Sequence, residues 1–148
     1  MSFDAQSFLD ATVSTASSTR TVPCPIGEYF GIIEKVLPRQ WQSKDGTTSG
    51  IALDVLWLVE DANVKALLGR DTVVVKQGIM LDLAPLGGLD LSEGKNVGLG
   101  RLREAVGKNQ NGEQFSFSML PGLTAKISVT HRVAGEDTFG EVKAVAKL

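Results

Sequence analysis

Residues 49–59, "SGIALDVLWLV", alternate between two rows of side chains, which is the pattern of a β-strand. One row is entirely apolar and consists of Ile51, Leu53, Val55, Trp57 and Val59. The other row carries a carboxylate among apolar residues: Ala52, Asp54, Leu56 and Leu58. The first row is expected to face the core, so Trp57 is predicted to be a core residue rather than part of a binding surface.

Four further strands and one main helix are predicted around this segment. The strands are residues 27–37, 71–83, 123–133 and 138–148, and a glycine inside the first of them, Gly31, indicates a bulge or a tight bend. Residues 97–109 carry Leu99, Leu102, Ala105 and Val106 at helical spacing. Between the second and third strands, Asp61 and Gly69 are the expected N-cap and C-terminal stop of one or two helical turns.

The order is therefore three strands, a helix and two strands. This order predicts a mostly β protein: a five-stranded Greek-key barrel of the oligonucleotide/oligosaccharide-binding (OB) type, with the helix between strands three and four capping one end. Residues 22–148 are expected to form this domain. Residues 1–21 are rich in serine and threonine and are expected to be an N-terminal arm, flexible or involved in self-association, with Phe3, Phe8 and Leu9 in a short amphipathic turn.

Composition limits the classes of protein. The net charge of −2 and the pI of about 5.4 argue against a surface that attracts nucleic acid everywhere, but they allow a local basic groove. Cys24 is the only cysteine, so no internal disulfide and no cysteine-based zinc site can form. No apolar run approaches the length of a membrane helix, and the N-terminus does not resemble a signal peptide. A cytoplasmic protein with no membrane partner is expected.

Catalytic motifs are not recognisable. His131 is the only histidine, no G-x-S-x-G nucleophile motif occurs, and the glycine-rich residues 88–100 lack the G-K-S/T ending of a phosphate-binding loop. No metal site or cofactor is expected, and the protein is not predicted to be an enzyme.

The remaining features of the sequence indicate a binding function. Residues 35–50, "KVLPRQWQSKDGTTSG", are interpreted as the loop between the first two strands, and they place Trp41 among three cations. Aromatic rings that stack bases beside cations that contact phosphates are typical of single-strand binders. The alternative is that Trp41 folds back over the barrel mouth. The predicted contact set combines this loop with cations of the outward strand rows: Trp41, Lys35, Arg39, Lys44, Lys76, Lys126, Arg132 and Lys143.

Several segments resemble the phage-encoded single-stranded DNA-binding proteins of OB fold. They are "PIGEYFGIIEKVLPRQWQSKDGTTSGIALDVLW", "LGRLREAVG", "LPGLTAKISVTH" and "FGEVKAVAKL", and the resemblance covers residues 22–148. It implies sequence-independent coating of single-stranded DNA in phage replication or recombination, in the host cytoplasm. The implied partners are single-stranded DNA, replication or recombination proteins and a second copy of the chain. The sequence departs from many such proteins because it ends "VKAVAKL" rather than in an acidic tail.

Two other functions fit the same features. A capsid-decorating or tail-associated virion protein would also combine near-neutral charge, β-structure and an arm that subunits exchange. A partner-binding module without a nucleic-acid role would fit the acidic pI.

Overall fold

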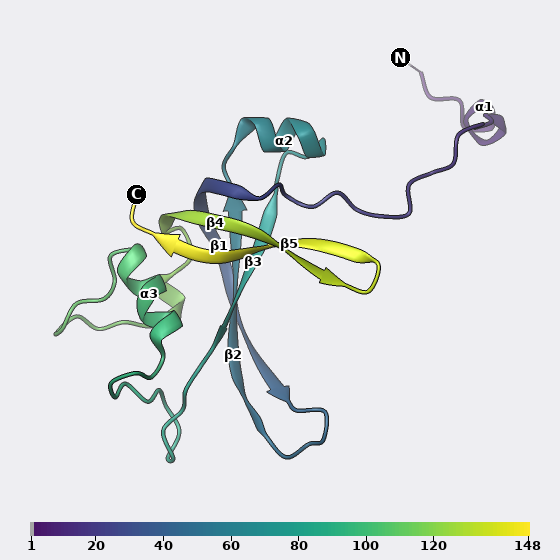
Figure 1. Ribbon diagram of the computed structural model, residues 1–148. Coiled ribbons are helices and arrows are strands. Elements are labelled where there is room, and N and C mark those ends of the chain that lie inside the picture. The colour runs from purple at the N-terminus through teal and green to yellow at the C-terminus, as the bar shows by residue number, and fades with distance from the viewer. Residues whose placement is uncertain (1) are drawn as a thin grey trace.

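The computed structural model describes residues 2–148 and is mostly β-sheet (Figure 1). The strands are β1 (Gly27–Gln42), β2 (Ser49–Val59), β3 (Val74–Met80), β4 (Thr124–Ala134) and β5 (Asp137–Ala146). The helices are α1 (Ala5–Asp10), α2 (Ala62–Leu68) and α3 (Val97–Ala105), with a short 3-10 turn at Phe117–Met119. The predicted order of three strands, a helix and two strands is confirmed.

The five strands form one mixed sheet that closes into a ring in the order β1-β2-β3-β5-β4. Four of the pairings are antiparallel. The fifth, between β3 and β5, is parallel and consists of a single bridge, Lys76 to Glu141. Strand β1 is shared: its first half pairs with β4, and its second half pairs only with β2.

The core fills the inside of this ring. Trp57, Val55 and Val59 are completely buried at 0% exposure, so the prediction that Trp57 is a core residue is confirmed. The other strands contribute residues such as Ile33, Val75, Ile79 and Ile127, and α3 and the segment after it contribute Leu99, Leu102 and Leu120. Each of these side chains stabilises the fold by roughly 1.5–3 kcal/mol relative to an exposed position.

One polar pair lies inside this apolar core. The indole Nε1 of Trp57 donates a hydrogen bond of 2.9 Å to Oε1 of Gln77. Gln77 shares the inward row of β3 with Val75 and Ile79, as its spacing predicted. The bond explains how a glutamine is tolerated there, because buried polar groups are costly only when they are unpaired.

Gly31 pairs in regular register with both neighbouring strands, and the bulge in β1 occurs later. The register of β1 against β2 shifts between Ile33 and Lys35, which leaves Glu34 as the extra residue. Gly31 is required for a different reason: a Cβ there would lie 2.9 Å from the Trp57 ring and 3.0 Å from Ile127. The glycine therefore lets the β1 backbone approach the core tryptophan.

Strand β1 is longer than predicted, and this changes the position of Trp41. Residues 38–42 were expected to be loop, but they continue the strand to Gln42, and the connecting turn is only residues 43–48. Pro38 is tolerated because this half of β1 has a partner on one side only, so a missing N–H can face the open edge. Trp41 is a strand residue opposite Gly50, not a loop residue.

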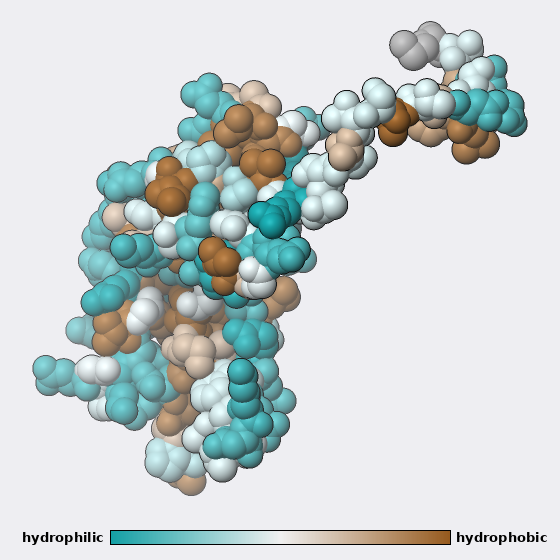
Figure 2. Space-filling model, turned by 45° about the vertical axis from the view of Figure 1, so that its right-hand side comes forward, coloured by the Kyte–Doolittle hydropathy of each residue, from teal (hydrophilic) through white to brown (hydrophobic). Residues whose placement is uncertain are grey.

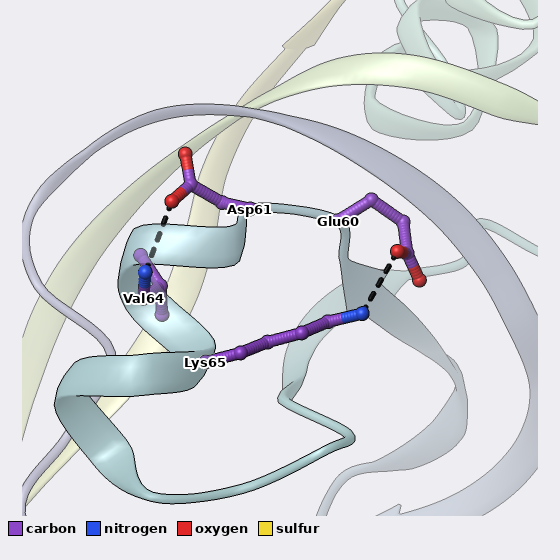
Figure 3. A network of polar contacts seen from close by, with 4 residues as sticks. All are labelled: Glu60, Asp61, Val64 and Lys65. Atoms are coloured by element: carbon purple, nitrogen blue, oxygen red, sulfur yellow. Dashed lines mark hydrogen bonds and ion pairs between the residues drawn. The ribbon is translucent and has the colours of Figure 1, made fainter.

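Helix α2 is capped by local residues, whereas Asn96, the N-cap residue of α3, makes no side-chain capping hydrogen bond. Asp61 accepts a hydrogen bond from the Val64 amide at the start of α2, and Lys65 pairs with Glu60 at 2.9 Å (Figure 3). Gly69 ends α2 in the left-handed conformation with φ 64°, so both predicted helix signals are confirmed. Helix α3 ends at Ala105, earlier than the predicted limit of 109. Among residues 2–148, no helix is long and apolar enough to cross a membrane.

The N-terminal segment extends away from the ring of strands (Figure 1). It contains α1, capped by the side chain of Asp4, and residues 2–22 are all exposed. The expected amphipathic turn is present, with the Phe3 and Phe8 rings 5.7 Å apart. Figure 2 shows hydrophobic side chains at the far end of this arm, away from the rest of the molecule.

Candidate functional site

The candidate site is the outer face of β1, β2 and β3, the side of these strands that points away from the core. The register places the outward residues of the three strands in adjacent rows. These rows are Lys35–Leu56–Lys76, Leu37–Asp54–Gly78, Arg39–Ala52–Met80 and Trp41–Gly50. Trp41 and three of the predicted cations therefore share one continuous surface, although they come from two strands that residues 43–73 separate in the sequence.

Trp41 lies across the β2 backbone at one end of this outer face. A Cβ on Gly50 would lie 2.8 Å from ring atoms of Trp41, so the absence of a side chain at Gly50 makes room for the indole. The tryptophan is half-buried, and its neighbours Gln40, Gln42, Ser49 and Leu83 line an open pocket of about 560 Å³. Trp41 is therefore neither a core residue nor a freely exposed one.

Arg39 and Asp54 form an ion pair in the middle of the outer face, with Arg39 Nε 3.0 Å from Asp54 Oδ2. The other carboxylate oxygen, Oδ1, is buried and has no hydrogen-bond partner within residues 2–148. The Nε1 of Trp41 is the other buried side-chain atom of residues 2–148 that has no hydrogen-bond partner. Both unpaired atoms of the described chain thus lie on the same face, one a donor and the other an acceptor.

Lys35 and Lys76 occupy one row, on either side of Leu56. Two strand spacings separate their backbones, which is about 10 Å. Within the part of the chain that the structure describes, neither ammonium group has a carboxylate within 4.0 Å. Their charge is therefore available to an anion, whereas that of Arg39 is partly compensated by Asp54.

Arg132 and Lys143 extend this surface beyond β3. Arg132 lines a pocket of about 310 Å³ together with Lys76, Phe139 and Glu141, and its Nε is 3.3 Å from Glu141 Oε2. Lys143 lines a second pocket of about 360 Å³ with Gly78 and Met80 of the outer face. The two pockets flank the β3–β5 bridge, so both cations adjoin the outer face on its β5 side.

Lys44 lies in the exposed turn between β1 and β2, beside Asp45. Ser43 and Thr47 donate hydrogen bonds to Asp45 Oδ1, the hydroxyl of Ser43 at 2.6 Å and that of Thr47 at 2.8 Å. These bonds, the one from Ser43 first, lower the pKa of Asp45 from 3.8 to about 2. The turn is thus fixed by local hydrogen bonds and holds Lys44 at the Trp41 end of the outer face.

Lys126 is the predicted contact residue that the structure does not bring to this face. It lies on β4 opposite Phe30 of the first half of β1, and its Nζ is 3.4 Å from Glu28 Oε2. Strand β5 separates it from Lys76. Its outward direction was predicted from the alternation of β4, but alternation carries no information about which strands become neighbours.

Sequence reasoning missed the apolar part of this surface. Met80 is 56% exposed and Leu37 is 46% exposed. Leu37 pairs with Asp54, and Met80 lies in the row of Arg39 with Ala52 between them. Phe139 is 41% exposed beneath the guanidinium of Arg132, at 5.6 Å. Phe30 points outward and Tyr29 inward, where its hydroxyl donates to the Pro25 carbonyl at 2.8 Å. The available signal was the alternation of β3, which places Met80 in the same outward row as Lys76.

The groups that could have suggested catalysis lie elsewhere. His131 is hydrogen-bonded at 2.8 Å through Nε2 to the carbonyl oxygen of Cys24. Cys24 is buried, and burial raises the pKa of its thiol. Within residues 2–148, no three histidine, cysteine, aspartate or glutamate side chains are grouped so that they could hold a metal ion.

No protein-family model matches the sequence, and no curated protein is significantly similar to it.

Proposed function

We propose that the protein binds single-stranded nucleic acid, with single-stranded DNA as its ligand, through the outer face of β1, β2 and β3. We also propose that the closed ring of strands is an OB-type barrel. Three features support this fold: the strand order, closure through β3 and β5, and a helix between β3 and β4. In OB folds the face of strands two and three and the loops next to it bind oligonucleotides.

The observation that carries the proposal is the placement of Trp41 on the same face as Lys35, Arg39 and Lys76. An aromatic ring offers a surface on which any base can stack, and each stack contributes about 1–3 kcal/mol. The lysines lie about two strand spacings apart, within reach of successive phosphates at physiological ionic strength. Such contacts read no base edge, so binding would not depend on sequence.

The unpaired atoms add a second line of support. A buried donor or acceptor without a partner costs about 1–3 kcal/mol, and native structures rarely retain one without a reason. Trp41 Nε1 and Asp54 Oδ1 are such atoms, and they border the surface where a ligand would lie. A phosphate or base acceptor would satisfy the indole N–H after a small movement of the ring.

Fluorescence titration with oligo-dT tests the proposal. Trp57 is buried at 0% exposure, so quenching on binding should come from Trp41, the only other tryptophan. Trp41→Ala should weaken binding by roughly 5- to 150-fold. The fluorescence anisotropy of a labelled oligonucleotide measures this loss of affinity. Lys76→Ala should weaken binding less and reduce the salt slope by about 0.7, the loss of one phosphate contact on a single strand.

Lys126→Ala is the matched control, since it removes the same charge from the β1–β4 seam outside the outer face. Affinity that falls equally for Lys76→Ala and Lys126→Ala would indicate a diffuse charge effect and contradict the proposed face. Absence of any binding to oligo-dT at low salt would contradict the function itself. Duplex DNA and poly-A RNA in the same titration define the preferred substrate.

A virion structural role is the second candidate, and the exposed apolar arm favours it because subunits in particles exchange such arms. This role predicts that the protein co-purifies with particles and that the oligonucleotide titration shows no binding.

A further inference from the structure

Helix α3 and the end of β5 enclose an open groove, here called the α3–β5 groove, of about 680 Å³. Its floor is apolar and is formed by Val97, Gly100, Ala105, Val145 and Ala146. The groove adjoins the pocket that contains Lys143, with which it shares Arg101 and Val145, but none of its lining residues belongs to β1, β2 or β3, whose outer face is proposed to bind nucleic acid. Val97 is 46% exposed there, so apolar surface faces solvent.

The N-terminal arm carries apolar side chains that have no partner in the rest of the described chain. Phe3, Phe8 and Leu9 are 77%, 69% and 74% exposed, and the two phenyl rings contact each other. Phe8 and Leu9 lie in α1, and Phe3 precedes its N-cap with its ring against that of Phe8, so α1 presents a small apolar cluster of the kind that occupies apolar grooves. The arm and the groove thus each present an uncovered apolar surface.

The charges of the two surfaces are complementary. Residues 2–19 carry Asp4 and Asp10 and no basic residue. The rim of the groove carries three cations, Lys95, Arg101 and Lys147, and one carboxylate, Glu104, which pairs with Lys147 at 3.2 Å. An acidic, apolar segment therefore fits this groove better than a basic one would.

The geometry favours the arm of another molecule. The arm leaves the domain on the side away from α3 (Figure 1). About eleven residues, 11–21, separate α1 from the domain, and they span on the order of 35 Å when extended. This reach allows α1 to contact a neighbouring copy without a change in the domain.

We propose that α1 of one molecule docks into the α3–β5 groove of a second copy of the same chain. The contact joins two different surfaces, so a pair keeps one free groove, on the molecule whose arm is docked, and one free arm, on the other molecule. Association should therefore continue beyond the dimer as the protein concentration rises, in the absence of any nucleic acid.

Two variants break the contact from opposite sides. Phe8→Ser removes one ring of the arm, with Val13→Ser as the control because Val13 is an exposed arm residue outside α1. Gly100→Leu fills the groove, and a Cβ at Gly100 meets no atom within 4 Å, so the fold should be retained. Gly98→Leu is its control on the same helix, facing a different pocket.

Sedimentation equilibrium over the micromolar range measures the outcome. The wild type should associate, Phe8→Ser and Gly100→Leu should each raise the dissociation constant about tenfold or more, and both controls should behave as wild type. An equimolar mixture of Phe8→Ser and Gly100→Leu should restore dimers but nothing larger, since only one intact arm and one intact groove remain per pair.

Three results would overturn the proposal. The first is a wild type that stays monomeric at all concentrations. The second is undiminished association of Phe8→Ser. The third is a mixture of the two variants that remains monomeric while circular dichroism shows both to be folded.

Discussion

Replacing Gln77 with leucine should destabilise the protein although it places an apolar residue in an apolar core. The substitution leaves the Trp57 indole N–H without its acceptor, at present 2.9 Å away. Trp57 is completely buried and Gln77 is 9% exposed, so water cannot replace the lost partner. The unpaired donor costs about 1–3 kcal/mol. For a chain of this size the melting temperature should fall by roughly 3–9 °C.

A double-mutant cycle isolates the hydrogen bond from the change in packing. Trp57→Phe leaves the Gln77 amide unpaired and also creates a cavity, so it should cost more than Gln77→Leu. The double variant removes both polar groups and keeps only the cavity. Its loss of unfolding free energy should therefore be smaller than the sum of the single losses by about 1 kcal/mol or more.

Urea unfolding followed by circular dichroism is the assay, because tryptophan fluorescence is altered by one of the substitutions. Gln110→Leu, at an exposed position, is the control and should change stability by less than about 0.5 kcal/mol. Losses that add within about 0.5 kcal/mol would show that the two side chains are not coupled and would refute this reasoning.

Three further predictions concern single groups. Gly50→Ala should displace the Trp41 ring from β2, because the new Cβ would lie 2.8 Å from it, and acrylamide should then quench tryptophan fluorescence more strongly. The hydrogen bonds to the Asp45 carboxylate contribute stability that is complete above about pH 4 and is lost as pH falls through about 2, so the Thr47 amide resonance should shift only in that range. Cys24 is buried with a raised thiol pKa, so a disulfide reagent should label it slowly in the native protein and quickly in urea.

Strands β2, β3 and β4 were predictable because each has a buried face and an outward face. Strand β3 alternates strictly between buried and exposed residues, and β2 places Trp57 in a row that is buried from Leu53 to Val59. Alternation of this kind is a local property, so the sequence contains it directly. The limits of these strands were therefore predicted to within a few residues.

The second half of β1 could not be predicted in this way. Residues 37–40 are all exposed, so the apolar alternation that marks a strand is absent there. Pairing with β2 alone holds this segment in the sheet, and pairing is a property of two segments at once. The same limit applies to the candidate site: the outward direction of Lys76 and Lys126 was correctly inferred, but their separation depends on the strand order.

The single bridge between β3 and β5 has a mechanical consequence. In every other strand pairing of the ring several residues are paired, whereas β3 and β5 have only Lys76 opposite Glu141. Local opening of the native protein should begin at this seam. The amides of β1 around Gly31, where the strand pairs with both β2 and β4, should exchange with deuterium last. The β3–β5 seam is therefore expected to be the least stable part of the closed sheet, and Arg132 and Lys143 line the pockets on either side of it.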